Sequence, residues 1–174
     1  RGKKGSEYEG GVRVPFIAAW AKPDAKNKFQ KKYPIAQNAV QLQQGTVMDL
    51  YPTILSVAHV KSPKHYALDG ADLKKLLQGK EDKNHRDDFL MHFPHGEHRA
   101  NYFTTYRKGD WKLIYYYNPE TTGIPTWKLY NLKDDPYETS ELSAKYPEKT
   151  ASMIELMKNR LTEENALYPI TENK

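Results

Sequence analysis

The 174-residue chain contains no cysteine and no long apolar run. The absence of cysteine excludes disulfides, thiolate metal sites, iron–sulfur clusters and a cysteine nucleophile within this sequence. A membrane-spanning helix needs roughly 18 consecutive apolar residues. No such run occurs, although 38% of the residues are hydrophobic. The composition therefore predicts a soluble chain without a membrane span, long enough to bury a core of its own.

The N-terminal end also lacks the pattern of a secretory signal peptide, in which positive charge precedes an apolar stretch. The first residue is Arg1 rather than methionine. We therefore expect the sequence to be a piece of a longer protein, whose targeting segment would lie upstream. The compartment stays open on this sequence alone.

Positive charge is concentrated in the first part of the chain. Residues 1–64 contain 11 Lys and Arg against 4 Asp and Glu, a net charge of +7. Residues 65–174 contain 16 against 18, a net charge of −2. An anionic partner would thus be attracted to the N-terminal part. Nucleic acid is disfavoured, because no groove-reading helix, aromatic RNP-like strand or GxxxxGK[ST] loop accompanies the charge.

The hydrophobic pattern of the first half is typical of an α/β protein. Residues 12–20 form a nearly continuous apolar run, which predicts a strand covered on both faces of a mixed sheet. Residues 46–58 carry one apolar helical stripe that follows a capping pair, Thr46 and Asp49. Because proline removes a backbone hydrogen bond, we expect Pro52 to kink this helix.

The second half has the pattern of an antiparallel sheet. Four short segments rich in aromatic and β-branched residues are separated by turns, and they predict strands that pair with their sequential neighbours. These segments are residues 89–93, 100–106, 111–117 and 126–132. Both alternating sets of the third segment are largely apolar, so both faces of the sheet should be covered, and its aromatic residues are expected in the core rather than on a sugar-binding surface. A helix with Pro147 at its first position would close one face.

The glycine-rich stretch before residue 12 is the most informative for chemistry. Lys4 precedes a glycine on a loop that leads into an apolar segment, so its ammonium could be held beside a bound anion. Residue type alone favours the alternative of an ordinary solvated lysine, since such lysines are common in loops.

Four segments of the chain resemble motifs of the sulfatase family, and they occur in the family's order. Residues 4–15, K-G-S-E-Y-E-G-G-V-R-V-P, resemble the pattern K-G-[ST]-x-[YW]-E-G-G-x-R-x-P. Residues 49–55 are similar to a D-[LI]-x-P-T-[IL]-L helix, residues 68–73 to an L-D-G-x-[SD]-L loop, and residues 127–138 to an L-Y-[DN]-L-x-x-D-P-x-E strand end. The resemblance covers essentially the whole chain.

The resemblance implies the C-terminal part of an arylsulfatase-like enzyme with a mixed α/β, alkaline-phosphatase-like fold. Residues 1–85 would form the end of the catalytic α/β domain. Residues 86–174 would form a C-terminal subdomain of α+β character, with a four-stranded antiparallel sheet packed against a C-terminal helix. By resemblance, the complete protein would be secreted, periplasmic or lysosomal.

Sulfatases use a formylglycine, made from Cys or Ser in a C/S-x-P/A-x-R motif, and a calcium ion held by Asp and Asn; both precede this segment in the family. The chain has no cysteine and no serine in that motif. We therefore expect calcium and formylglycine only in the complete enzyme, no metal or cofactor bound by this segment, and no activity from the segment alone. The missing N-terminal part of the same protein would be its partner.

In the sulfatase family a lysine of the first motif contacts a sulfate oxygen, and by position that residue is Lys4 rather than Lys3. A fixed cation would stabilise the negative charge that builds on the sulfate oxygens. We interpret Glu9 and Arg13 as structural residues that could pair with each other, and Gly10–Gly11 as a backbone turn.

A second stretch with possible chemistry is residues 92–99, H-F-P-H-G-E-H-R. Its three histidines and Glu97 are suitable zinc ligands, but Pro94 and Gly96 predict a loop, in which this spacing does not bring the histidines together. Ordinary surface histidines are an alternative, and His92 is expected to end a strand. Since loops of the sulfatase C-terminal subdomain can border the active-site pocket, the resemblance also implies substrate contacts from this stretch. The residues proposed for substrate contact are His95, His98 and Arg99.

The implied reaction is hydrolysis of a sulfate ester or sulfamate, with a sulfated small molecule or carbohydrate as substrate. Two alternatives stay open. A non-catalytic module could bind anionic carbohydrate through the basic N-terminal half and the His- and Arg-rich loop of residues 92–99. An alkaline-phosphatase-like hydrolase could act on phosphate instead, although the K-G-S-x-Y-E-G-G sequence disfavours it.

Overall fold

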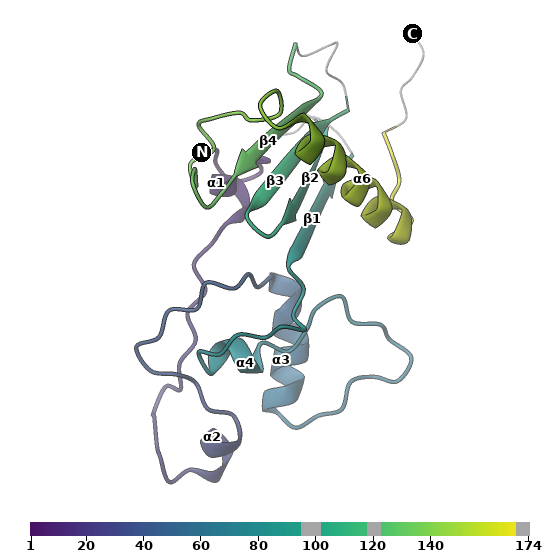
Figure 1. Ribbon diagram of the computed structural model, residues 1–174. Coiled ribbons are helices and arrows are strands. Elements are labelled where there is room, and N and C mark those ends of the chain that lie inside the picture. The colour runs from purple at the N-terminus through teal and green to yellow at the C-terminus, as the bar shows by residue number, and fades with distance from the viewer. Residues whose placement is uncertain (95–101, 118–122, 170–174) are drawn as a thin grey trace. The chain divides into compact units, whose positions relative to one another are not determined.

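The computed structural model describes residues 1–94, 102–117 and 123–169 (Figure 1). Contacts divide the chain into two compact units. Arg1–Val14 and Asp88–Lys174 form one, which we call the sheet unit, and Pro15–Asp87 form the other, the helical unit. The division predicted at residues 85 and 86 concerns the domains of the complete enzyme and stays a prediction. Within this chain, residues 1–14 pack with the sheet.

The sheet unit is built on a four-stranded antiparallel sheet with the order β1-β2-β3-β4. Its strands are β1 (Asp88–Phe93), β2 (Phe103–Lys108), β3 (Trp111–Tyr116) and β4 (Trp127–Asn131). The prediction of four strands with sequential neighbours is confirmed. Lys108 pairs with Trp111 across the β2–β3 hairpin, and Gly109 at the turn has a φ of +56°, which glycine adopts without steric cost.

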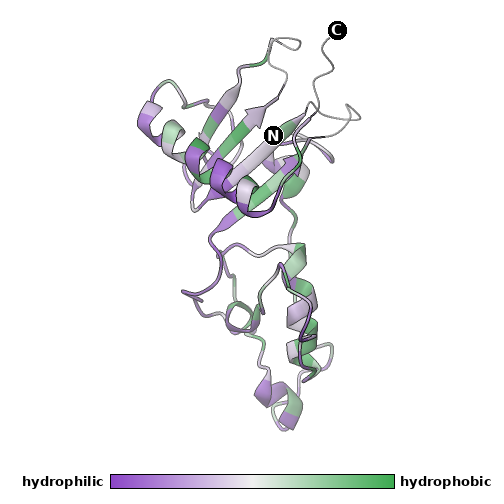
Figure 2. Ribbon diagram, turned by 90° about the vertical axis from the view of Figure 1, so that its right-hand side faces the viewer, coloured by the Kyte–Doolittle hydropathy of each residue, from purple (hydrophilic) through white to green (hydrophobic). Residues whose placement is uncertain are grey.

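One face of the sheet is covered by the C-terminal helix α6 (Pro147–Glu163), as predicted, with Pro147 in its first turn. Figure 1 shows this helix lying across the strands. Because only one stripe of an amphipathic helix faces the core, most of α6 is hydrophilic, whereas the strands carry apolar residues (Figure 2). The core on this side contains Tyr106, Leu113, Leu129, Met153, Met157 and Leu161.

The opposite face of the sheet is covered by the N-terminal segment, which includes the short helix α1 (Glu9–Val12). Tyr8 joins a buried cluster with Phe103, Ile114, Tyr116, Tyr130 and Leu132. Alternate residues of β3 thus enter the two cores, since successive side chains of a strand point to opposite faces. Both faces are covered, as the apolar pattern of residues 111–117 predicts.

The strand predicted at residues 12–20 is wrong. Val12 ends α1, and no strand follows it before Trp20. The side chains of Val14, Phe16 and Ile17 are 77%, 58% and 88% exposed. An extended segment becomes a strand only where its N–H and C=O groups have a partner strand, and residues 14–19 have none in the described chain.

The helical unit contains α2 (Lys28–Lys32), the 3₁₀ helix η1 (Val47–Asp49), α3 (Leu50–Val57) and α4 (Lys74–Leu77). The helix predicted at residues 46–58 is confirmed, and so is its capping box of Thr46 and Asp49. Pro52, at which a kink was expected, lies in the first turn of α3, where amides have no helical partner to lose.

Two of the motif segments bind each other within the helical unit. Asp49 Oδ1 accepts a hydrogen bond from the amide of Ala71 over 2.8 Å. Thr53 Oγ1 donates to the carbonyl of Asp49 over 2.6 Å and accepts from the amide of Leu73 over 2.9 Å. Asp49 and Thr53 are both buried, so these motif residues hold the loop to the helix rather than contact a substrate.

Among the helices of the described residues, none is long and apolar enough to cross a membrane.

Candidate functional site

Lys4 lies in a tight turn of the sheet unit. The amide of Ser6 donates to the carbonyl of Lys3 over 2.9 Å, which closes the turn. Gly5 follows Lys4 with a φ of +86°, as the third position of such a turn requires. Lys4 is exposed, and within the described part of the chain its ammonium makes no hydrogen bond or ion pair. It is therefore available to an external anion. Lys3 beside it is also exposed.

The backbone of the turn that contains Lys4 packs closely against the backbone of α1. The amide of Gly10 donates to the carbonyl of Arg1 over 2.7 Å, and a Cβ on Gly10 would lie 2.5 Å from that oxygen. A Cβ on Gly11 would collide with the carbonyl oxygen of Ser6. The glycine pair thus belongs to a helix rather than to the expected turn, and it is needed because the chain before it passes so close.

Beneath α1 lies a cluster of charged side chains, which we call the ion cluster: Glu9, Arg107, Lys112 and Glu138. Lys112 Nζ lies 3.0 Å from Glu9 Oε1 and 2.8 Å from Glu138 Oε1. Arg107 Nη1 lies 3.8 Å from Glu9 Oε2. The Glu9 carboxylate therefore pairs with the sheet and not with Arg13, which is exposed. Lys112 and Glu138 are only 2% and 0% exposed.

A second polar set anchors the two residues that precede Glu9. The Tyr116 hydroxyl donates to Glu7 Oε1 over 2.7 Å, and Lys128 Nζ donates to the Tyr8 hydroxyl over 3.0 Å. Burial, together with the hydrogen bonds to Tyr8 and Glu7, raises the pKa of Tyr116 far above its usual range, so it stays a donor. Three consecutive residues, 7–9, are thus fixed to the sheet directly after the turn that carries Lys4.

His92 is the penultimate residue of β1, as expected of a histidine at a strand end. Its Nδ1 lies 2.7 Å from Thr104 Oγ1, and its Nε2 lies 2.7 Å from the carbonyl oxygen of Leu167. Both ring nitrogens are therefore engaged within the protein. The residues proposed for substrate contact, His95, His98 and Arg99, lie outside the described residues.

The side chains that the structure describes do not fit a calcium ion, and the sequence does not fit a formylglycine. In residues 1–94, 102–117 and 123–169, no group of three or more His, Asp or Glu side chains could hold a metal. The sequence has no cysteine, and no serine in a C/S-x-P/A-x-R motif, from which a formylglycine could be made. What the described chain offers at Lys4 is an exposed ammonium.

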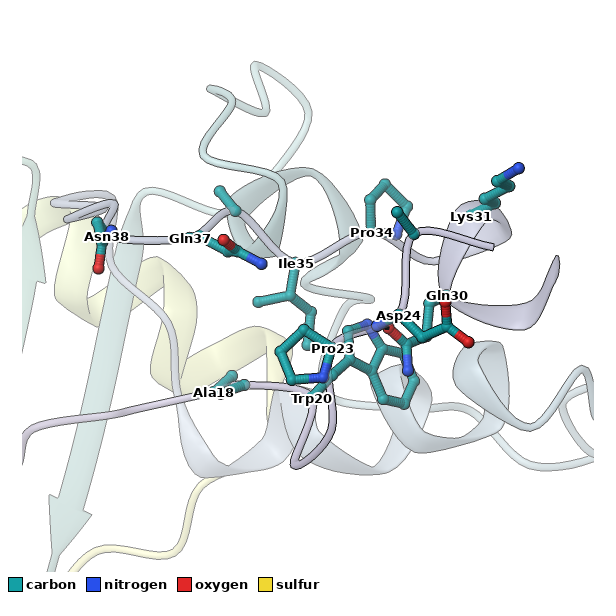
Figure 3. A pocket seen from close by; sticks show the side chains of 13 residues that line it. Ala18, Trp20, Pro23, Asp24, Gln30, Lys31, Pro34, Ile35, Gln37 and Asn38 are labelled. Carbon is teal, nitrogen blue, oxygen red and sulfur yellow. Dashed lines mark hydrogen bonds between the residues drawn. The ribbon is translucent and has the colours of Figure 1, made fainter. Parts of the chain in front are cut away.

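The helical unit contains a hollow of about 600 Å³ (Figure 3). Trp20, Pro23 and Ile35 form part of its lining. Gln30 in this lining is bound within the unit, since its side chain accepts from the amide of Asp24 and donates to the carbonyl of Lys22. The lining also includes Asp24 and Lys31, but no motif segment reaches it, so Lys4 remains the stronger candidate.

The sequence analysis missed Lys112 and Glu138. Glu138 ends the D-P-x-E part of the last motif, and Lys112 is the only charged residue in the apolar run 111–117. A charged side chain at an inward strand position requires a buried partner. The charge of Lys112 within an apolar strand therefore indicated that a buried acidic partner exists.

Comparison of this sequence with known proteins identifies the family to which the chain belongs. Residues 3–166 match the model of the family described as N-sulphoglucosamine sulphohydrolase, C-terminal. The chain is 35% identical to a sulfatase of Formosa agariphila, over 91% of this chain and 28% of that protein. It is 28% identical to human N-acetylgalactosamine-6-sulfatase, over 95% of this chain and 33% of the relative.

A solved structure of a related protein also aligns with this chain. BT4656, in complex with its substrate D-glucosamine-2-N,6-O-disulfate, aligns with a TM-score of 0.53 and 29% identity, over 66% of this chain and 23% of that chain. The chain thus spans about a third or less of the proteins it matches. The match to these proteins also confirms the mixed α/β fold that the motifs predict. The family model covers nearly the whole chain, and on that ground this chain belongs to the sulfatase family, in the part described as N-sulphoglucosamine sulphohydrolase, C-terminal.

Proposed function

We propose that the complete protein hydrolyses sulfate esters or sulfamates of sulfated carbohydrates, and that Lys4 contributes to the sulfate-binding site. The observation that carries this proposal is the placement of Lys4. Its ammonium is exposed on a closed turn, and residues 7–9 anchor that turn to the sheet. The nucleophile and the metal ligands would come from the part of the protein upstream of this chain.

Hydrolysis of a sulfate ester places negative charge on the oxygens of the sulfate and of the leaving group. A lysine ammonium stays protonated during such a step, so it stabilises that charge without moving a proton. A preorganised donor of this kind is worth about 10²–10³-fold in kcat, provided that it is already in place when the charge develops. The anchoring of the turn to the sheet would hold the backbone of Lys4 in place before the charge develops.

The carbohydrate class is supported by the relatives. One is an N-acetylgalactosamine-6-sulfatase, and the substrate of BT4656 carries one sulfate on nitrogen and one on oxygen. We also propose His95, His98 and Arg99 as substrate contacts, because imidazolium and guanidinium groups bind sulfate oxygens through charge-assisted hydrogen bonds.

The test is release of inorganic sulfate by the complete protein. D-glucosamine 6-O-sulfate, N-sulfoglucosamine and the 6-phosphate of glucosamine would be supplied as separate substrates, with sulfate and phosphate measured by ion chromatography. We expect sulfate release from at least one sulfated sugar and no comparable phosphate release. The present chain alone should release no sulfate above its Lys4→Ala variant. Turnover of the phosphate in preference to both sulfated sugars would contradict the proposal.

A non-catalytic module that binds anionic carbohydrate is the second candidate function. It is favoured by one observation, the exposed lysines that follow one another within residues 22–32 of the helical unit: Lys22, Lys26, Lys28, Lys31 and Lys32. If the complete protein releases no sulfate while it binds heparin in a salt-sensitive way and ignores desulfated heparin, this second function is the correct one.

A further inference from the structure

We infer that Glu138 and its partner Lys112 are positioning residues for Lys4. They would act from the buried side of the N-terminal segment by fixing the backbone of the turn that contains Lys4. This inference rests on the role proposed above for Lys4. Neither residue reaches the exposed face of the turn, because both side chains are buried.

Glu138 holds the Lys4 turn from both of its flanks. On one side, Arg1 Nη1 donates to the Glu138 carbonyl oxygen over 3.3 Å. On the other side, the amide of Glu9 donates to Glu138 Oε2 over 2.7 Å. The segment between Arg1 and Glu9 is therefore a loop whose two ends meet at one residue, and Lys4 lies midway along it. A shift of Glu138 would move both ends of the loop.

Glu138 is itself held in an uncommon conformation. Its φ is +56°, which costs a residue with a side chain of order 1 kcal/mol or more and persists only where the surroundings impose it. Asp135 imposes it from outside, because its Oδ2 accepts from the amides of Thr139 and Ser140 over 2.7 and 2.8 Å. The buried side of Glu138 is fixed by Lys112. A conformation that its neighbours impose from both sides indicates that the position of Glu138 is closely fixed.

The charges of the ion cluster compensate one another. Two carboxylates, Glu9 and Glu138, face two cations, Arg107 and Lys112, so the cluster is balanced. If Lys112 were absent, one buried carboxylate of the cluster would lack a compensating charge. Lys112 thus maintains the geometry of Glu138, and through Glu138 that of the turn.

The experiment is a double-mutant cycle in the complete enzyme. Glu138→Gln keeps the shape of the side chain and removes its charge, and it would be made both with Lys4 present and in the Lys4→Ala background. We expect Glu138→Gln to lower kcat about tenfold with a smaller change in KM when Lys4 is present, since small displacements of a catalytic group reduce kcat steeply. In the Lys4→Ala background it should cost almost nothing further. A purely structural role would lower kcat by the same factor in both backgrounds.

Two more variants make the result decisive. Asp135→Asn acts on Glu138 from a partly exposed position and should fold even where Glu138→Gln does not; we expect a few-fold loss of kcat that again depends on Lys4. Arg160→Met removes ion pairs on α6, on the other face of the sheet, and should act equally in both backgrounds.

The outcomes separate this inference from the proposed function. If Lys4→Ala lowers kcat and Glu138→Gln or Asp135→Asn acts equally in both backgrounds, the positioning role is wrong and the role of Lys4 stands. If Lys4→Ala itself leaves kcat unchanged, the proposed role of Lys4 is wrong and the positioning role falls with it.

Discussion

Replacing Lys112 by methionine tests whether the ion cluster holds the N-terminal segment on the sheet. The substitution keeps most of the volume of the side chain and removes its ammonium. That ammonium lies 3.0 Å from Glu9 and 2.8 Å from Glu138, and Glu9 and Glu138 are 7% and 0% exposed. Arg107 remains, at 3.8 Å from Glu9 and at a partly exposed position. One buried carboxylate of the two therefore loses its compensation.

Removing one partner of a buried ion pair costs about 3–5 kcal/mol, because the other charge stays away from water without a partner. A matched control lies on the neighbouring strand. Lys128 donates to the neutral hydroxyl of Tyr8 on the same face of the sheet, so Lys128→Met removes a charged donor without isolating a carboxylate. Its cost should be about 1–2 kcal/mol.

Hydrogen exchange measured by mass spectrometry on peptides from β2 and β3 would detect the difference in the complete protein, because it reports local opening. Since about 1.4 kcal/mol corresponds to a factor of ten, Lys112→Met should speed exchange by about two to three and a half orders of magnitude, and Lys128→Met about tenfold. Equal protection in the two variants, or less than a tenfold change for Lys112→Met, would refute the view that the charge of Lys112 is buried and structurally required.

Three further predictions concern other parts of the molecule. Gly11→Ala places a methyl group against the carbonyl of Ser6, so the Lys4 turn must shift; we expect kcat for sulfate release to fall at least tenfold, and unchanged kinetics would contradict this. Asp49→Ala removes a helix cap and leaves the amide of Ala71 unpaired, so the 68–73 loop should lose about 2–3 kcal/mol of local stability, read as faster cleavage there by a protease than in the parent protein. Burial raises the pKa of Tyr117 to about 12, whereas an unfolded tyrosine titrates near about 10. The unfolded chain loses that proton first, so stability should be constant below about pH 10 and fall as the pH rises towards 12; urea midpoints that do not change between pH 9 and about 11.5 would contradict this.

The sheet and the last helix could be predicted from sequence because their information is local. Alternating apolar residues and a two-residue turn at Gly109 define the β2–β3 hairpin, and Pro147 marks the start of α6. The strand expected at residues 12–20 failed for the opposite reason. Its apolar pattern is correct for a strand, but a strand also needs a partner, and the described chain offers none.

In the candidate site, too, only the residues within a local motif could be predicted. Lys4 could be singled out through a short motif in which its glycine and Glu9 stand a few residues away. The need for a buried partner of Lys112 could be predicted, but the partners could not, because the contacts of the ion cluster join residues far apart in the sequence: 103 positions separate Lys112 from Glu9, and 129 separate Glu138 from Glu9. Local periodicity carries no information on such pairs, and only the fold brings them together.

The central claim is that a fixed lysine of this chain stabilises sulfate during hydrolysis, and one comparison tests it most directly. Lys4→Ala and Lys3→Ala would be made in the complete protein, and kcat for release of inorganic sulfate from a sulfated glucosamine would be measured for each. Lys4→Ala should lower kcat about 10²–10³-fold, whereas Lys3→Ala, which removes an adjacent and equally exposed charge, should change it less than about threefold. Equal losses would show that only the general positive charge of the loop matters, and an unchanged kcat in Lys4→Ala would contradict the claim itself.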